Sequence, residues 1–298
     1  MQPIVGIVTV LYNSDDVIED FFASLGRQRD VAFKLYVIDN SPSSAALDRC
    51  RAFAVELDIS AEFVFNGANL GVAKGNNQGI ELALRDGCPY VLLSNNDTEF
   101  AEGTIGELIR ALQRGESVAT PKILYHGAQN LIWYAGGRID AWTMRTPHLG
   151  QLAPDRGQYD VARHTGYAPT CFLLIDSAVF RRIGLMDERY FVYYDDTDFV
   201  WRLTRAGIAI QYVPSATVQH KVSTSTGGEL SPFTLYYTNR NRIYFIRKNF
   251  HGLKRAGALS YALLTRLPQT VRLPWPLAKR LWAGVKDGLA LPVNADVR

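Results

Sequence analysis

Short segments rich in β-branched residues alternate with longer mixed segments through the first 120 residues. The short segments span residues 4–10, 33–39, 61–65, 90–94 and 118–120, and the longer ones span residues 17–25, 45–57, 76–84 and 104–113. This alternation predicts strands and helices in turn, and hence an α/β fold whose mostly parallel sheet is covered by helices on both faces. Ligands of such sheets bind at the carboxyl ends of the strands, so we expect the functional site there.

The alternation breaks after Pro121. Residues 122–167 carry scattered glycine, proline and aromatic residues, which predicts hairpins and loops. Further strands are expected at residues 171–175 and 208–213, helices at residues 177–183, 198–205 and 233–248, and a mobile loop at residues 223–228. We therefore expect one large domain over residues 1–250, made of the halves 1–121 and 122–250, and an extension over residues 251–298.

The composition is that of an ordinary globular protein. With 47% hydrophobic and 20% charged residues, it excludes a disordered, collagen-like or coiled-coil chain. Three widely spaced cysteines, Cys50, Cys88 and Cys171, predict neither a disulfide framework nor a metal knuckle. No secretory signal is recognised before the first strand, and no apolar run reaches the roughly 18 residues of a spanning helix. These features predict a cytoplasmic protein.

Positive charge is concentrated at the C-terminal end. The formal net charge is +3, but residues 251–298 carry +6 and residues 1–250 carry −3. Four apolar residues of this extension recur at helical spacing among basic residues and tryptophans: Leu277, Leu281, Val285 and Leu289. The pattern predicts a basic amphipathic helix that either rests on an anionic membrane surface or packs on the body of the protein. Nucleic acid is not an expected partner, because no basic stripe covers the body.

Common nucleotide and metal motifs are absent. The first strand is followed by neither a G-x-G-x-x-G fingerprint nor a phosphate-binding loop, which argues against dehydrogenases and ATPases. The pattern H-E-x-x-H is missing, and the five histidines are too scattered to form a spacing signal. The chemistry must therefore come from other polar residues.

Two acidic residues stand at strand ends. Asp39 follows an apolar segment within Asp39-Asn40-Ser41, and Asp97 closes the run LLSNND. A strand-end carboxylate can accept hydrogen bonds from a ribose or a nucleobase, although a turn or helix cap would use Asp39 equally well. Oxygen ligands at a strand end also suit Mg²⁺ or Mn²⁺ that bridges a diphosphate.

The densest acidic cluster lies in the segment YFVYYDDTD. Asp195, Asp196 and Asp198 are crowded between aromatic residues, and crowded carboxylates raise one another's pKa, as a general base requires. An acidic first helical turn is the alternative reading for Asp198. His220 follows a predicted strand and could complete a metal site or be an ordinary loop histidine.

Six blocks follow one another along the chain: TVLYNS, VIDNS, NLGVAKGNNQGI, LLSNND, the segment from GYAPTC to DFVWRL, and YYTNRNRIYFIRK. In this order they resemble inverting family 2 glycosyltransferases of the GT-A fold, particularly bacterial rhamnosyltransferase-like and galactofuranosyltransferase-like members. The resemblance covers residues 3 to about 250. It implies a GT-A, Rossmann-like sheet with flanking helices, a nucleotide-binding half at residues 1–121, and an acceptor and catalytic half at residues 122–250.

The resemblance also implies a nucleotide-sugar site. Its expected residues come from the four N-terminal blocks: Thr9, Tyr12, Asn13, Asp39, Asn69, Gly71, Lys74, Asn76, Asn95, Asn96 and Asp97. The family's metal-binding Asp-x-Asp appears here as Asn95-Asn96-Asp97. The expected cofactor is Mg²⁺ or Mn²⁺, held by Asp97 with help from Asn95 or His220.

Catalytic and acceptor residues follow from the same resemblance. Asp196 aligns with the family's catalytic base, and Asp195 stands where the family usually has glutamate, so either member of the pair could be the base. Residues expected on the acceptor side are Trp133, Tyr193, Trp201 and Arg240.

The expected reaction is transfer of a sugar, with inversion, from a nucleoside diphosphate donor to a hydroxyl of a glycan or lipid-linked glycan. The subgroup suggests dTDP-L-rhamnose as donor and O-antigen or a similar polysaccharide as product, made by a cytoplasmic enzyme on the inner membrane. Two alternatives stay open. A nucleotidyltransferase would need a basic glycine-rich loop where TVLYNSDD stands, and a noncatalytic glycan-binding protein would have lost the acids, whereas Asp97 and Asp196 are present.

Overall fold

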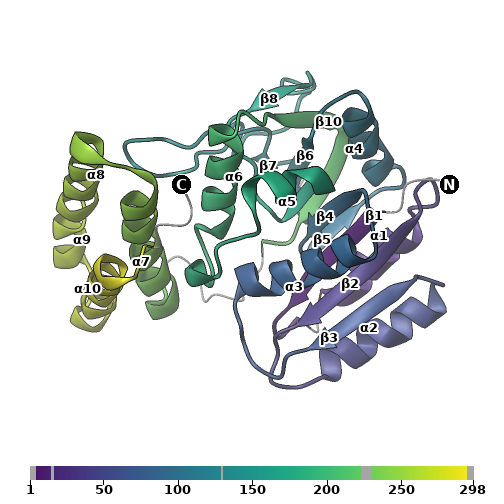
Figure 1. Ribbon diagram of the computed structural model, residues 1–298, viewed down its shortest axis with the longest axis horizontal. Helices are drawn as coiled ribbons and strands as arrows, with labels where there is room; N and C mark the ends of the chain where they lie inside the picture. The colour runs from purple at the N-terminus through teal and green to yellow at the C-terminus, as the bar shows by residue number, and fades with distance from the viewer. Residues whose placement is uncertain (1–4, 15–16, 129, 223–229, 294–298) are drawn as a thin grey trace. The chain divides into compact units, whose positions relative to one another are not determined.

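The structure is a computed structural model that describes residues 5–14, 17–128, 130–222 and 230–293, and the chain divides into two compact units (Figure 1). The larger unit comprises residues 1–138, 147–191 and 195–222, and the smaller comprises residues 139–146, 192–194 and 223–298. Two expectations, a first strand starting at Ile4 and a loop at residues 223–228, lie outside the described residues.

Four parallel strands form the N-terminal half of the sheet in the order β3-β2-β1-β4. Their bounds are β1 Val5–Leu11, β2 Phe33–Asp39, β3 Ala61–Phe65 and β4 Tyr90–Ser94. The helices between and after them are α1 Ile18–Gly26, α2 Ala45–Glu56, α3 Val72–Arg85 and α4 Thr104–Gln113. Strands and helices alternate here as the sequence predicts, and the apolar residues of β1, β2 and β4 are mostly buried.

The sheet becomes mixed beyond β4. Strand β9 runs antiparallel to both β4 and β6, and the order continues β4-β9-β6-β10-β5, with β7 paired to β6 and β8 to β10. These strands are β5 Thr98–Phe100, β6 Val118–Tyr125, β7 Ile132–Tyr134, β8 Arg163–Thr165, β9 Phe172–Asp176 and β10 Ile210–His220. The remaining helices of the larger unit are α5 Ser177–Ile183, a 3₁₀ turn at Glu188–Tyr190 and α6 Asp195–Arg205.

Two element boundaries differ from expectation in places that matter for function. Strand β10 continues past Pro214, because its pairing with β6 is interrupted at this residue and resumes at Thr217. His220 is therefore the last residue of a strand and not part of a loop. Helix α6 begins at Asp195, three residues earlier than predicted, so both members of the acidic pair lie in its first turn.

The smaller unit contains four helices among its described residues, α7 Pro232–Asn249, α8 Gly252–Leu264, α9 Leu267–Arg272 and α10 Trp275–Ala290 (Figure 1). Helix α10 packs closely on α7: a Cβ added to Gly284 would lie 2.3 Å from the Tyr236 carbonyl oxygen, and one on Gly288 would lie 2.4 Å from that of Arg240. Leu281 is buried on the same helix. The apolar stripe predicted for the extension is thus used, in its middle, for packing on α7.

No helix within the described parts of the chain is both long enough and apolar enough to cross a membrane.

Candidate functional site

The carboxyl ends of β1 and β2 present two buried oxygens without partners. Asp39 is fully buried, and its Oδ1 accepts a hydrogen bond of 2.8 Å from the Ser41 backbone amide. Among the described residues, neither Oδ2 of Asp39 nor Oγ1 of Thr9 has a hydrogen-bond partner. Because buried polar atoms in folded proteins are nearly always paired, these oxygens mark a place where a ligand can donate. Asp39 thus closes the turn with one oxygen, while its other oxygen is left without a partner among the described residues.

The loop after β1 is tied to the turn after β2. The Asn13 backbone amide donates to Ser41 Oγ at 3.0 Å, and Asn13 adopts a left-handed backbone with φ of 50°. Tyr12 beside it is exposed. The loop residues expected in the nucleoside pocket therefore lie next to Asp39.

The segment from Asn69 to Asn76 joins the strand ends to the acidic cluster. Gly71 donates its amide to Asn69 Oδ1 at 3.0 Å, and the next residue, Val72, donates to the Phe191 carbonyl oxygen at 2.6 Å. Gly71 has φ of 87° and lies close to the backbone at Phe191. A Cβ added to it would lie 2.6 Å from the Phe191 carbonyl oxygen. Gly71 therefore has a clear structural role, because it contacts the backbone at Phe191, four residues before Asp195.

Lys74 and Asn76 follow on α3. The Lys74 ammonium lies 4.0 Å from a Glu188 carboxylate oxygen on the surface, and Asn76 is buried. The structure describes no nucleotide, so the binding role expected for these two residues stays a prediction.

Asp97, in the turn before β5, and His220, the last residue of β10, form a buried pair. Asp97 Oδ1 lies 3.2 Å from His220 Nε2, and the register that pairs Thr98 with His220 brings the two side chains together. Asn95 is exposed and Asn96 is buried, with an amide nitrogen that has no partner among the described residues. The LLSNND loop thus places one carboxylate and one imidazole side by side.

Asp97 and His220 supply part of the ligand set that a divalent ion needs. The described residues contain no group of three or more His, Cys, Asp or Glu side chains that could enclose a metal. Asp97 supplies a hard oxygen and His220 a nitrogen, and the buried Nδ1 of His220 has no hydrogen-bond partner among the described residues. Such a pair suits Mg²⁺ or Mn²⁺ if oxygens of a diphosphate and water fill the other positions.

The two acids at the start of α6, Asp195 and Asp196, have different surroundings. Asp196 is half-buried, and it accepts hydrogen bonds from the Thr197 amide at 2.6 Å and from the Tyr167 hydroxyl. Asp195 is buried, and burial together with the charge of Asp196 raises its pKa to about 8. Asp195 is therefore the neutral member of the pair at pH 7, and Asp196 is the candidate base.

The backbone before the pair is strained. Phe191, Tyr193 and Tyr194 have φ values of 65°, 62° and 65°, a region that residues with a side chain rarely adopt. Strain of this kind persists only where surrounding contacts enforce it, and it is often found at functional sites.

A row of aromatic rings connects Asp196 with the Asp97–His220 pair, in the order Tyr167, His148, Trp133 and His220. The His148 ring stacks on Tyr167 with centroids 5.7 Å apart and meets Trp133 edge-on at 4.7 Å, and Trp133 meets His220 at 4.8 Å. The sequence analysis assigned no role to Tyr167 or His148. Tyr167 had a signal, since it opens the block GYAPTC, whereas the isolated His148 had none.

The pKa of Cys171 indicates that Asp97 and Asp196 lie near one another. Burial, followed by the charges of Asp97 and Asp196, raises the pKa of the Cys171 thiol well above its ordinary value. Cys171 also accepts a hydrogen bond of 2.8 Å from the Asn95 amide through its carbonyl oxygen. The Asp97 carboxylate beside His220 and the Asp196 carboxylate beside Tyr167 therefore lie close together in the larger unit.

The four residues expected on the acceptor side differ in placement. Trp133 belongs to the aromatic row, but Trp201 lies five residues after Asp196 on α6, and hence about 140° around the helix from it. Tyr193 and Arg240 belong to the smaller unit. There the Tyr193 hydroxyl lies 3.2 Å from Thr234 Oγ1, and Arg240 Nε donates to Asn241 at 2.8 Å.

Comparison with known proteins gives a consistent result. The family model described as Glycosyl transferase family 2 matches residues 6–184. An N-acetylglucosaminyl-diphospho-decaprenol L-rhamnosyltransferase of Mycobacterium tuberculosis is 28% identical over 247 residues, which cover 76% of this chain and 79% of that protein. A dTDP-rhamnosyl transferase of Shigella flexneri is 21% identical over 251 residues, covering 81% and 79%.

Two solved structures share the fold. A mannosyltransferase from Pyrobaculum calidifontis in complex with GDP-Man and Mn²⁺ has a TM-score of 0.58 and 14% identity, covering 99% of this chain and 77% of that one. Residues 1–349 of S. aureus TarS in complex with UDP give a TM-score of 0.58 and 15% identity, covering 97% and 81%. At these identities the likeness shows the fold alone, and it confirms the GT-A architecture predicted from the sequence.

Proposed function

The chain belongs to glycosyl transferase family 2 and is a glycosyltransferase, and we propose that it transfers L-rhamnose from dTDP-L-rhamnose, with inversion, to a lipid-linked diphosphate glycan. The donor and acceptor classes are those in the names of the two rhamnosyltransferase relatives. The observation that carries the proposal is the gathering, in one unit, of an unpaired Asp39 oxygen, the Asp97–His220 pair and a positioned Asp196. Cell-surface polysaccharide synthesis is the process in which such a reaction would serve.

The proposed reaction is a single displacement. The acceptor hydroxyl attacks the anomeric carbon from the face opposite the diphosphate, Asp196 takes the hydroxyl proton, and the bond to the diphosphate breaks with its electron pair on the phosphate oxygen. Tyr167 and Thr197 hold the Asp196 carboxylate in place. A neutral Asp195 adds no second charge that would raise the cost of binding an anionic donor. A divalent ion held by Asp97 and His220 would supply positive charge to offset that of the departing diphosphate.

Metal-dependent donor binding is the first test of this assignment. In a thermal-shift panel of UDP-, dTDP- and GDP-sugars, we expect dTDP-L-rhamnose with Mn²⁺ to raise Tm by roughly 5 °C at about 100 times Kd. Asp97→Ala should abolish the part of the shift that requires metal. Asp48→Ala, which removes an exposed carboxylate on α2, is the matched control and should retain it. A full metal-dependent shift in Asp97→Ala would exclude Asp97 as a ligand.

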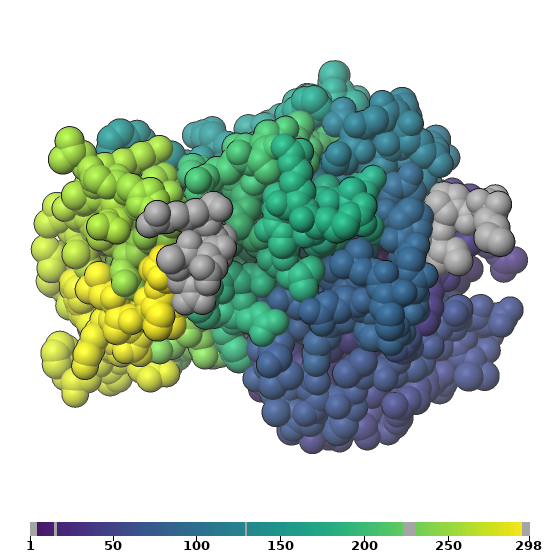
Figure 2. All heavy atoms as spheres, in the orientation of Figure 1, coloured from purple at the N-terminus to yellow at the C-terminus, as the bar shows by residue number. Residues whose placement is uncertain are grey.

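We further propose that the enzyme works at the cytoplasmic face of the membrane, on which α8 and α9 rest. Figure 2 shows atoms of α8 to α10, coloured lime to yellow, on the face that it draws. Leu264, Leu267 and Val271 are exposed and follow one another at three- and four-residue spacing, with Val271 88% exposed. Exposed apolar residues on short helices with basic neighbours suit the interface of an anionic bilayer.

Replacing these three residues by serine should reduce co-sedimentation with phosphatidylglycerol vesicles several-fold, because each buried side chain contributes apolar area. The matched control replaces three exposed apolar residues of the larger unit by serine: Val55, Leu152 and Val161. Point variants are preferable to deletion of residues 251–298, since deletion would uncover the face of α7 on which α10 packs. Equal sedimentation of both triple variants would contradict the membrane proposal.

A further inference from the structure

The smaller unit contains three arginines for which the described residues offer no counter-ion. They come from separate segments: Arg145 from residues 139–146, Arg242 from α7, and Arg266 from the residue that precedes α9. None of the three forms a salt bridge with a described residue. Arg242 is only 4% exposed, and its buried Nε has no hydrogen-bond partner.

Aromatic residues pack around Arg242 and near the segment that carries Arg145. The Arg242 guanidinium lies over the Tyr261 ring at 5.7 Å from its centroid. Tyr194 packs against Phe245 of α7 and donates its hydroxyl to the Met144 carbonyl oxygen at 2.9 Å, next to Arg145. Arg242 is therefore held in a built site, Arg266 is half-buried and donates to Gln269 at 2.9 Å, and Arg145 is exposed.

The charges are close enough to act on one another. Burial lowers the pKa of Arg242, and the positive charge of Arg145 lowers it further. Burial lowers the pKa of Arg266 to about 10, and the charges of Arg242 and Arg145 contribute. A buried guanidinium surrounded by like charge is costly, so the cluster is expected to gain stability from a bound anion.

Both acids among the described residues of this unit accept hydrogen bonds from other groups. Its described residues include twelve arginines and lysines but only two acids, Asp140 and Asp287. Asp140 accepts from the Trp142 and Thr143 amides at 2.9 and 2.8 Å, and Asp287 accepts from the Tyr236 hydroxyl at 2.6 Å. Neither of these two acids forms an ion pair with the three arginines, so a bound anion can take that place.

We propose that Arg145, Arg242 and Arg266 bind the diphosphate of the lipid-linked acceptor. Guanidinium groups bind phosphate oxygens in pairs of parallel hydrogen bonds, and three of them match the charge and oxygen count of a diphosphate better than those of a carboxylate. The identification of this diphosphate as the acceptor's rests on the proposed function, whereas the anion site itself does not.

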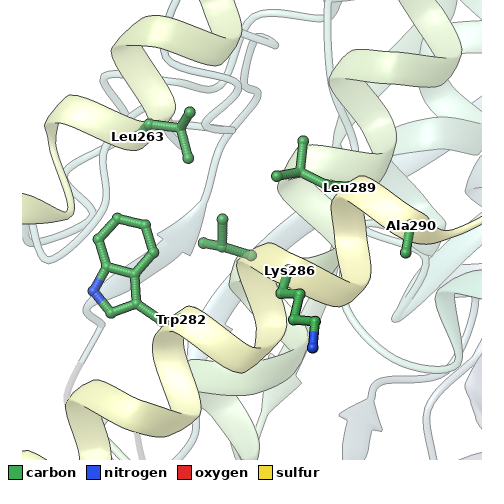
Figure 3. A pocket seen from close by; sticks show the side chains of 6 residues that line it. Leu263, Trp282, Lys286, Leu289 and Ala290 are labelled. Atoms are coloured by element: carbon green, nitrogen blue, oxygen red, sulfur yellow. The ribbon is translucent and has the colours of Figure 1, made fainter.

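An apolar pocket in the same unit supports a lipid-linked source for the diphosphate. It has a volume of about 580 Å³ and is lined by Leu263, Trp282, Val285, Lys286, Leu289 and Ala290. Figure 3 shows Leu263 of α8 facing Trp282 of α10 across the pocket. The pocket is close to Arg266 in the sequence, since Leu263 lies three residues before this arginine. Thr270 lies four residues after Arg266, and its Oγ1 accepts a hydrogen bond of 2.9 Å from Trp282. A prenyl chain attached to a diphosphate at the arginines could therefore extend into this pocket.

Binding of inorganic pyrophosphate in the presence of EDTA, measured by calorimetry, tests the anion site. Arg145→Gln/Arg266→Gln should weaken the affinity by about tenfold or more, because two charge-assisted contacts are lost. Arg255→Gln/Arg272→Gln removes two exposed arginines of the same unit and should leave the affinity within about twofold. Equal affinities of the wild type and the first double variant would overturn the proposal.

Arg242→Met separates binding from folding. Since methionine fills similar volume without a buried charge, we expect this variant to unfold at a higher temperature than the wild type and yet to bind pyrophosphate about tenfold more weakly. A variant that is more stable and binds pyrophosphate normally would show that Arg242 is outside the site and would overturn its part in the proposal.

Kinetics distinguish the possible sources of the diphosphate. With a short-chain prenyl diphosphate glycan as acceptor, Arg145→Gln/Arg266→Gln should raise the acceptor KM about tenfold and leave the donor KM unchanged. When the same glycan is supplied as a neutral alkyl glycoside, both double-arginine variants and the wild type should have the same acceptor KM. A raised donor KM, or lost binding to phosphatidylglycerol vesicles with normal pyrophosphate affinity, would overturn the proposal in favour of the donor or a membrane headgroup. A wild type that transfers to no acceptor would count against the proposed reaction, while the pyrophosphate measurement would still decide the anion site.

Discussion

Asp196→Asn is expected to lower kcat by about 10² to 10⁴, the usual contribution of a positioned general base, with little change in donor affinity. Asp195→Asn is expected to retain most of the activity. Because the pKa of Asp195 is raised to about 8, asparagine resembles the form in which this side chain exists at neutral pH. Single-turnover rates with saturating dTDP-L-rhamnose and acceptor measure the difference between these two isosteric variants.

The same pair makes an independent prediction about stability. Asp195 has a folded-state pKa of about 8, above the value of about 4 for an unfolded aspartate, so the folded protein holds one more proton between these pH values. Stability should therefore fall as pH rises from about 4 to 8, and Asp195→Asn should remove this part of the slope. Urea denaturation at pH 5.5 and 8 measures it. Inactivation by Asp195→Asn with normal activity of Asp196→Asn would reverse the assignment of the base.

The parallel half of the fold could be predicted because its signals are local. Each strand from β1 to β4 is a short apolar run that ends where the sequence places it within one residue, and Asp39 and Asp97 stand at or after their carboxyl ends. The antiparallel insertion of β9 between β4 and β6 depends on pairing between distant segments, which periodicity does not encode.

The site shows the same division between local and long-range information. Asp196 could be named from the block in which it occurs and His220 from its place after a predicted strand, but the position of His220 inside β10 follows from a strand that resumes after Pro214. The stacking of His148 on Tyr167 joins residues that no local pattern links.

The charged cluster of the smaller unit illustrates the limit most clearly. The sequence showed that positive charge is concentrated near the C-terminal end, and that was interpreted as a single amphipathic helix. The burial of Arg242 and its proximity to Arg145 depend on how distant segments pack, because Arg145 comes from a loop far from α7 in the sequence. Only the folded arrangement distinguishes a solvated basic helix from an anion site.

Gly71→Ala is expected to lower the free energy of unfolding by about 3 kcal/mol or more and to reduce activity in the fraction that folds. At φ of 87° and ψ of 165°, Gly71 occupies a region open almost only to glycine. The new Cβ would also lie 2.6 Å from the backbone oxygen of Phe191, which cannot move without displacing the chain that leads to Asp196. Strain and overlap therefore act on the same segment, and the loss should appear both in urea denaturation and in kcat.

Gly67→Ala is the matched control. Gly67 also has a positive φ, 62°, but the nearest atom to its added Cβ is a Phe65 ring carbon at 3.5 Å, an ordinary contact distance. Gly67→Ala should lower the free energy of unfolding only by the cost of a left-handed backbone, about 1 to 2 kcal/mol, and should leave kcat unchanged. If Gly71→Ala and Gly67→Ala cost the same and both retain full kcat, contact between Gly71 and Phe191 does not hold the catalytic aspartate. A loss of kcat confined to Gly71→Ala would instead show that the nucleotide half of the sheet fixes the position of Asp196 through this one backbone contact.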